Sequence, residues 1–156
     1  MNQLRRTFLK SAGAVGTVAV TIAAGLLKPG VAFAAAWNNL AFAAKETADA
    51  IKNAGYEGAA ESKEIVIKAP DIAENGAVVP VSVTSNIPGT TSMAIFVEKN
   101  PLPLIADFEF LSGAEPNIST RIKMAKTSIV RVSVKAGGKN YTNSREVKVT
   151  IGGCGG

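Results

Sequence analysis

From residue 64 onward, apolar and polar residues alternate with a period of two, which is typical of half-buried β-strands. Seven apolar sets follow this pattern: Ile65 and Ile67; Val79, Val81 and Val83; Met93, Ile95 and Val97; Leu104, Ala106, Phe108 and Phe110; Ile118, Thr120, Ile122 and Met124; Val130, Val132 and Val134; Val147, Val149 and Ile151. Turn signals separate them, among them DIAENG, NIPG and EKNPLP. About seven short strands spaced in this way predict a mainly β fold, an antiparallel β-sandwich of immunoglobulin-like type.

The segment before these strands has helical periodicity instead. Leu40, Ala44, Ala48 and Ile51 form a stripe that predicts one N-terminal α-helix from Trp37 to Asn53. Gly55 follows it as a C-terminal stop. We therefore expect a helix and linker over residues 37–62 and a β-sandwich domain over residues 63–151.

Residues 1–36 have the composition of an export signal, with a charged start, an apolar run and small residues near Ala34 and Ala36. Arg5 and Arg6, followed by Phe-Leu-Lys, resemble a twin-arginine signal, which predicts export to the periplasm. The alternative is an uncleaved membrane anchor, but the run is shorter than the ~18–20 apolar residues that a span needs. We expect a cleaved signal and no stable membrane insertion.

Charge counts change once the signal is removed. The whole chain has 17 Lys+Arg and 12 Asp+Glu, and residues 1–36 hold four of the cations and none of the acids, so the rest carries a net charge of 13 − 12 = +1. This near-neutral balance argues against a nucleic-acid partner. The chain has no His and one Cys. That composition excludes His-based nucleophile arrangements and an internal disulfide, and it predicts no metal site and no cofactor.

The single cysteine lies in the terminal stretch VKVTIGGCGG, directly after the last predicted strand. Residues 152–156 predict a flexible arm in which Gly152, Gly153, Gly155 and Gly156 surround Cys154. Cys154 is three residues beyond the strand, so an extended arm reaches ~10 Å. A thiol on so slender an arm can enter a narrow channel in another protein. A free Cys has a pKa of ~8.5 and nothing on the arm lowers it, so activation must come from the receiving pocket.

This pattern favours a covalent carrier in which Cys154 is the attachment site and no residue of the chain is catalytic. Two alternatives remain open: a structural β-sandwich module that dimerises through a Cys154 disulfide, and a tail cysteine without a role. A ubiquitin-like carrier would use a terminal Gly-Gly thiocarboxylate and ATP in the cytoplasm, which the export signal disfavours. A thiol oxidoreductase would need a second Cys or a neighbour that lowers the thiol pKa.

Four cations on the predicted strands are also candidates for function. We expect them to share one outer sheet face, where they either steer anionic partners or pair with Asp107 and Glu109 across neighbouring strands. The second interpretation is favoured. These cations are Arg121, Lys123, Arg131 and Lys135.

The chain resembles the SoxY family, the sulfur-carrier subunits of the periplasmic Sox thiosulfate-oxidising system. The resemblance rests on VKVTIGGCGG, APDIAENGAVVPVSV, STRIKMAKTS and the RRTFLK signal. It implies that Cys154 holds thiosulfate-derived sulfur as an S-thiosulfonate and presents it to the Sox cytochrome, hydrolase and sulfur dehydrogenase enzymes. It also implies a heterodimer with SoxZ and export of the folded pair.

Overall fold

The computed structural model describes residues 37–111 and 113–151 of the chain. The chain divides into two compact units, Met1–Trp37 and Asn38–Gly156, and the fold given below is that of the second unit. The export-signal prediction, with Arg5 and Arg6, falls on residues 1–36 and so lies outside the described residues.

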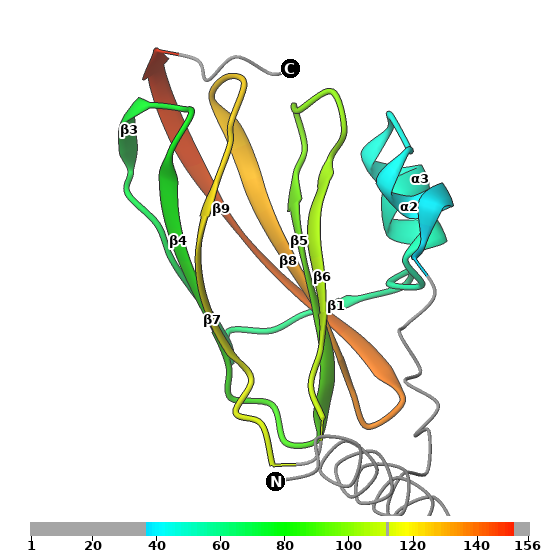
Figure 1. The fold of residues 1–156 in the computed structure, drawn as a ribbon. Coiled ribbons are helices and arrows are strands. Elements are labelled where there is room, and N and C mark those ends of the chain that lie inside the picture. Colours follow the sequence, from blue (N-terminus) through cyan, green and yellow to red (C-terminus); the bar gives the residue numbers. More distant parts are fainter. Residues whose placement is uncertain (1–36, 112, 152–156) are drawn as a thin grey trace, which may run out of the picture. The chain divides into compact units, whose positions relative to one another are not determined.

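The second unit is a sandwich of two β-sheets with a helical segment beside the larger one (Figure 1). The larger sheet has the order β1-β9-β8-β5-β6, and β3 also pairs with β9. The smaller sheet has the order β2-β4-β7. The bounds are β1 (Ala60–Glu61), β2 (Ile65–Lys68), β3 (Ile72–Asn75), β4 (Val79–Ser85), β5 (Thr90–Val97), β6 (Leu104–Glu109), β7 (Asn117–Ile122), β8 (Ser128–Ala136) and β9 (Lys139–Ile151).

This architecture confirms the predicted mainly β sandwich, and its seven antiparallel strands are β2 and β4 to β9. Two strands were missed, β1 and β3, and both run parallel to β9. The interpretation of DIAENG as a plain turn is therefore wrong, because β3 occupies Ile72–Asn75 within it. A strand of four residues that buries only Ala73 gives too little alternation to be recognised.

The main core lies between the two sheets, as the alternation predicts. On β4, for example, Val79, Val81 and Val83 are fully buried while Pro80 is exposed. The buried residues of this core are Ile65, Ile67, Ala73, Val79, Val81, Val83, Met93, Ile95, Val97, Ile122, Met124, Val130, Val132, Val134, Ala136 and Val147.

A second, smaller apolar cluster lies on the other face of the larger sheet, beneath the helices. It buries Ala94 and Phe96 of β5, so this strand is buried on both faces. Leu104 also belongs to it, although we expected Leu104 on the same face as Ala106 and Phe108. The reason is a register shift between Ile95 and Phe96, which pairs Phe96 with Leu104 and leaves Ile105 to pack against the main core.

The N-terminal helical segment is confirmed, but the prediction of one continuous helix is wrong. It forms α2 (Asn39–Phe42) and α3 (Thr47–Asn53). Glu46 is extended and so separates the two helices. The predicted stripe is partly correct, since Ala44 and Ile51 pack against the smaller apolar cluster. Leu40 is 75% exposed and Ala48 is exposed, and the fully buried residues of the two helices are Ala41 and Ala50. Small alanines let two short helices approach the sheet closely, and this packing outweighs the helical propensity of the linking residues.

Gly55 ends α3 as predicted. It adopts φ +75°, its N–H donates to the carbonyl of Lys52, and the N–H of Tyr56 donates to the carbonyl of Ile51. This pair of bonds is the Schellman arrangement, which favours glycine at the position with positive φ. It turns the chain so that Tyr56 is buried in the smaller apolar cluster.

Candidate functional site

The candidate attachment site, Cys154 with Gly152, Gly153, Gly155 and Gly156, lies outside the described residues. The described part of the chain ends at Ile151, the last residue of β9. The structure therefore shows the base from which residues 152–156 continue, and the question is how that base is held.

One edge of this base is held by β3, which runs parallel to the end of β9. Ile72 pairs with Lys148 and Asn75 pairs with Ile151. The backbone N–H of Gly76 donates to the carbonyl of Ile151 at 2.8 Å, and the Thr150 hydroxyl donates to the carbonyl of Glu74 at 2.9 Å. The backbone is thus bonded up to the final described residue, at the end of β9 beside β3 (Figure 1).

The opposite edge of β9 is held by β8 and then by a side chain. The ladder between β8 and β9 ends where Ser128 pairs with Val147. Beyond it, the Thr127 hydroxyl accepts a hydrogen bond from the Val149 N–H at 2.9 Å. Thr127 thereby extends the support of β9 past the end of β8.

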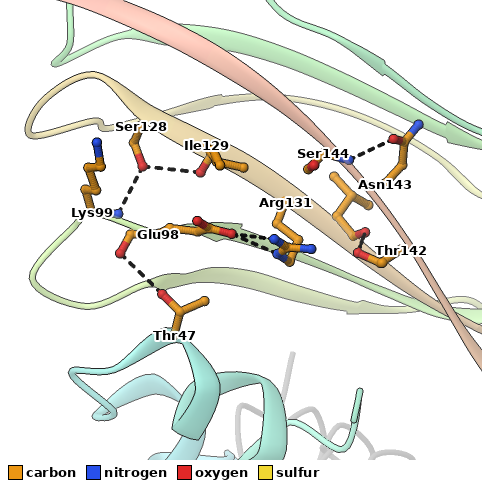
Figure 2. Close-up of polar contacts among 10 residues, drawn as sticks. Thr47, Glu98, Lys99, Ser128, Ile129, Arg131, Thr142, Asn143 and Ser144 are labelled. Atoms are coloured by element: carbon orange, nitrogen blue, oxygen red, sulfur yellow. Dashed lines mark hydrogen bonds and ion pairs between the residues drawn. The ribbon is translucent and has the colours of Figure 1, made fainter. Parts of the chain in front are cut away.

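Two ion pairs lie near this end of the sandwich. Arg145 of β9 contacts Asp71 at 2.7 Å, directly before β3. Asp71 is 85% exposed and Arg145 is 39% exposed, so water screens the pair and it adds little stability. Arg131 of β8 donates through Nε and Nη2 to one carboxylate oxygen of Glu98 at 2.9 and 2.6 Å, and the Thr47 hydroxyl donates to the Glu98 carbonyl (Figure 2). This contact links α3 to the end of β5 and β8.

The prediction of one outer face for four cations is wrong. Arg121 is on β7 of the smaller sheet and Lys123 follows that strand, whereas Arg131 and Lys135 are on β8 of the larger sheet. The alternation of apolar and polar residues correctly predicts that each cation points away from the core. It does not predict which of the two sheets a strand joins. The preferred pairing with acids is partly correct. Arg131 pairs with Glu98, which was not among the expected acids, and Lys135 lies close enough to the expected Asp107 to favour its charged form.

Lys135 belongs to a polar cluster under the helices. Its Nζ donates to the carbonyl of Ala54 at 3.0 Å and lies 4.3 Å from the centre of the Tyr56 ring. The Tyr56 hydroxyl donates to Asp107 Oδ1 at 2.7 Å and is hydrogen bonded to the Ser92 hydroxyl at 3.0 Å. Burial raises the pKa of Tyr56, and desolvation raises the pKa of Asp107 above its ordinary value. These contacts join the end of α3 and Tyr56 to β5, β6 and β8, so the cluster holds the helices on the sheet.

The described ranges contain neither a cluster of metal ligands nor a membrane-spanning helix. Residues 37–111 and 113–151 hold no group of three or more His, Cys, Asp or Glu side chains placed to bind a metal ion. In the same part of the chain, no helix has the length and apolar character needed to cross a membrane.

The geometry defines a class of protein: an immunoglobulin-like β-sandwich whose last strand comes directly before a Gly-Cys sequence. One edge of that strand is held as far as Ile151 and the other as far as Val149. A family model described as "sulfur oxidation protein SoxY" matches residues 51–154. The chain belongs to the SoxY family. Membership supports a sulfur-carrier role in sulfur oxidation, and the matched stretch ends on Cys154.

Comparison with solved structures agrees with this assignment. The sulfur carrier protein SoxY from Chlorobium limicola f thiosulfatophilum is 48% identical, with a TM-score of 0.59, and the alignment covers 67% of this chain and 96% of that chain. Two structures of superoxide reductase (neelaredoxin) from Ignicoccus hospitalis are 18% identical, with TM-scores of 0.49 and 0.48. Those alignments cover 55% of this chain and 78% and 79% of theirs. No curated protein sequence matches the chain.

Proposed function

We propose that the chain is a sulfur carrier that holds thiosulfate-derived sulfur covalently on Cys154 as an S-thiosulfonate. The observation that carries this proposal is the continuity between a fully bonded strand and the cysteine. β9 is held by β3 as far as Ile151 and by Thr127 as far as Val149. Cys154 follows Ile151 three residues later in the sequence, within the stretch that matches the family. A rigid base and a short glycine arm suit a nucleophile that is presented to other proteins.

The chemistry divides between the carrier and its enzymes. The Cys154 thiolate and a thiosulfate anion join through a new S–S bond and give up two electrons, which the Sox cytochrome accepts. Water then cleaves the S–S bond to the sulfonate group, releasing sulfate and protons and leaving a persulfide on Cys154. The sulfur dehydrogenase oxidises this remaining sulfur. The chain itself supplies the thiol and its presentation, while the pocket of each enzyme supplies the groups that activate the thiol.

The proposal includes a partner chain and a location. The carrier works in the periplasm as a heterodimer with SoxZ, and the Arg5-Arg6 pair directs export through the translocase for folded proteins. Folding with a partner that has no signal before export gives a reason for this route in a protein without a cofactor. Fractionation of cells, probed for both chains, tests it: finding both chains in the cytoplasm would contradict the location.

Intact mass spectrometry of the protein from thiosulfate-grown cells tests the carrier function. We expect adducts with the mass of an S2O3 group or of added sulfur atoms, removed by a thiol reductant and absent from the Cys154→Ser variant. That variant should fold normally and fail to support thiosulfate oxidation. A mass of twice the chain that reductant halves would instead support a Cys154-linked dimer, and thiosulfate oxidation by the Ser variant would refute the proposal.

A further inference from the structure

The length of the arm limits how far a partner enzyme can remain from the sandwich. Cys154 is three residues beyond Ile151, so its backbone reaches ~10 Å from the end of β9 when fully extended. An enzyme that receives the thiol in a pocket must therefore bring the mouth of that pocket against the end of the sandwich from which the arm continues. The surface around Ile151 is part of every such encounter, if the carrier function proposed above holds.

Three loops and the end of β9 form this surface, which we call the arm-side rim. It comprises residues 76–78, 99–103 and 123–127 with Ile151. These segments lie at the same end of the sandwich in Figure 1, and hydrogen bonds connect them.

The bonds run around the rim from segment to segment. The N–H of Met124 donates to the carbonyl of Gly76 at 2.7 Å, and the N–H of Gly76 donates to Ile151. The Asn100 side chain donates to the carbonyl of Lys123 at 2.8 Å and accepts from the N–H of Ala125 at 2.9 Å. The rim is therefore a continuous surface that is fixed relative to the base of the arm.

The charge of this rim is positive. Lys99, Lys123 and Lys126 are exposed, and in the described residues neither ion pair involves any of them. The acid next to Lys99 is Glu98, and Arg131 neutralises it, as Figure 2 shows. On the adjoining strands, Glu74 and Lys148 contribute one charge of each sign. The chain as a whole is nearly neutral after residue 36, so these unpaired cations are a local feature.

The rim also exposes apolar side chains between the lysines. Val78 is 54% exposed, Leu102 is 48% exposed and Ile151 is 69% exposed. Apolar contact with charged residues around it is the usual make-up of an interface that forms and separates repeatedly.

We propose that the arm-side rim is the docking surface for the enzymes that load and unload Cys154, and that these enzymes present acidic residues around the mouths of their pockets. The unpaired lysines supply the long-range attraction, which accelerates encounter and aligns the arm with the pocket. The exposed apolar residues supply the short-range contact once the two proteins meet.

A pair of charge-reversed variants tests this inference. Lys123→Glu with Lys126→Glu changes the rim, and Lys63→Glu with Lys139→Glu is the matched control with the same change in net charge. Lys139 is the first residue of β9 and lies beside the β8–β9 turn. Lys63 comes shortly before β2, at the end where Ile65 pairs with Ser85, the last residue of β4. Both lysines therefore lie away from the rim, toward the opposite end of the sandwich. The measurement is the second-order rate at which the Sox cytochrome loads the carrier with thiosulfate, followed by intact mass at several NaCl concentrations.

We expect the rim variant to be loaded about tenfold more slowly at low salt, with the difference shrinking as salt rises, and the control to stay within about twofold. Both variants should react with iodoacetamide at the wild-type rate and keep the wild-type circular dichroism spectrum, which shows that the thiol and the fold are intact. Equal slowing of both variants, or equal loading of all proteins, would overturn the inference. The inference would also be overturned if the rim variant were loaded at the wild-type rate but lost its sulfur adduct faster. That result would mean that the lysines hold the anionic sulfur group and do not attract the enzyme. Failure of the carrier function itself would appear differently, as wild-type protein that takes up no sulfur.

Discussion

Tyr56 links the N-terminal helical segment to the larger sheet, and replacing it with phenylalanine isolates the contribution of one hydroxyl. The side chain is 1% exposed and sits between the helices and the larger sheet. In Tyr56→Phe the ring keeps its edge-to-face contact with Phe96, whose ring centre is 6.3 Å away, and its contact with Lys135. The change removes only the hydrogen bonds to Asp107 and Ser92.

The expected loss of folding free energy depends on whether Asp107 and Ser92 find new hydrogen-bond partners. Asp107 is exposed enough to recover a water molecule, but Ser92 is 8% exposed and loses a buried partner. Loss of a hydrogen bond to a charged group, together with a buried group left unpaired, costs about 2 kcal/mol. For a domain of this size that lowers Tm by roughly 8 °C.

Urea denaturation followed by circular dichroism measures this cost, and Tyr141→Phe is the matched control. Tyr141 is half-buried, and no hydrogen bond or ion pair involves its hydroxyl in the described part of the chain. We expect the control to change the free energy of unfolding by less than ~0.5 kcal/mol. Equal effects of the two variants would refute the claim that the Tyr56 hydroxyl holds the helices on the sheet.

The effect of Tyr56→Phe should also depend on pH. The Tyr56 hydroxyl favours the ionised form of Asp107, while desolvation of the carboxyl raises its pKa above the unfolded value. A raised pKa means that the folded state binds the proton more tightly, so this contribution to stability is present below the unfolded pKa and is lost as pH rises through the folded pKa. Phenylalanine raises that pKa further, so the stability difference between wild type and variant should be larger at pH 7 than at pH 3. A difference independent of pH would contradict this assignment.

Two further variants test other contacts of the same region. Gly55→Ala should destabilise by about 1–2 kcal/mol, because its φ is positive and the new Cβ would lie 3.2 Å from Lys135 Nζ. Gly58→Ala is the control with a similar φ and open space, and a urea titration that gives both variants the same cost would show that the Lys135 contact is irrelevant. Arg131→Met should cost about 1 kcal/mol, because Glu98 is partly buried and loses its partner. Equal stability of this variant and wild type would show that the ion pair contributes nothing.

The strands were predictable because each buries one face against the same core, and burial imposes the period of two. Val130, Val132 and Val134 show this directly, since all three are fully buried on β8. The exceptions arise where a second layer covers the outer face. Phe96 and Leu104 are buried under the helices, and the residue pattern of the strands alone does not predict that helices cover this face.

Tertiary contacts explain the other differences between prediction and structure. The periodicity of residues 37–53 predicts one helix, but Glu46 is extended and separates two. The Asn38 side chain donates to the carbonyl of Asn53, and the Asn53 side chain donates to the carbonyl of Leu40, so contacts between the two helices favour the break. The assignment of strands to sheets depends on pairing between distant segments, and periodicity contains no information on it. The base of the candidate site was therefore out of reach of sequence reasoning, whereas Cys154 and its glycines were visible in the sequence itself.

The pairing of β3 with β9 explains how a β-sandwich can give a short arm a defined origin. The last residues of β9 extend beyond its final pairing with β8, at Val147. Without further support, four residues of overhang would add ~13 Å of loosely held chain to the arm. β3 and Thr127 bond this overhang on both edges, so only Gly152 and Gly153 separate Cys154 from bonded backbone. A shorter connection keeps the thiol at a higher effective concentration near the rim. In the function proposed above, the support of β9 and the glycines beside Cys154 would therefore serve one requirement: a docked enzyme would find the thiol within reach of its pocket.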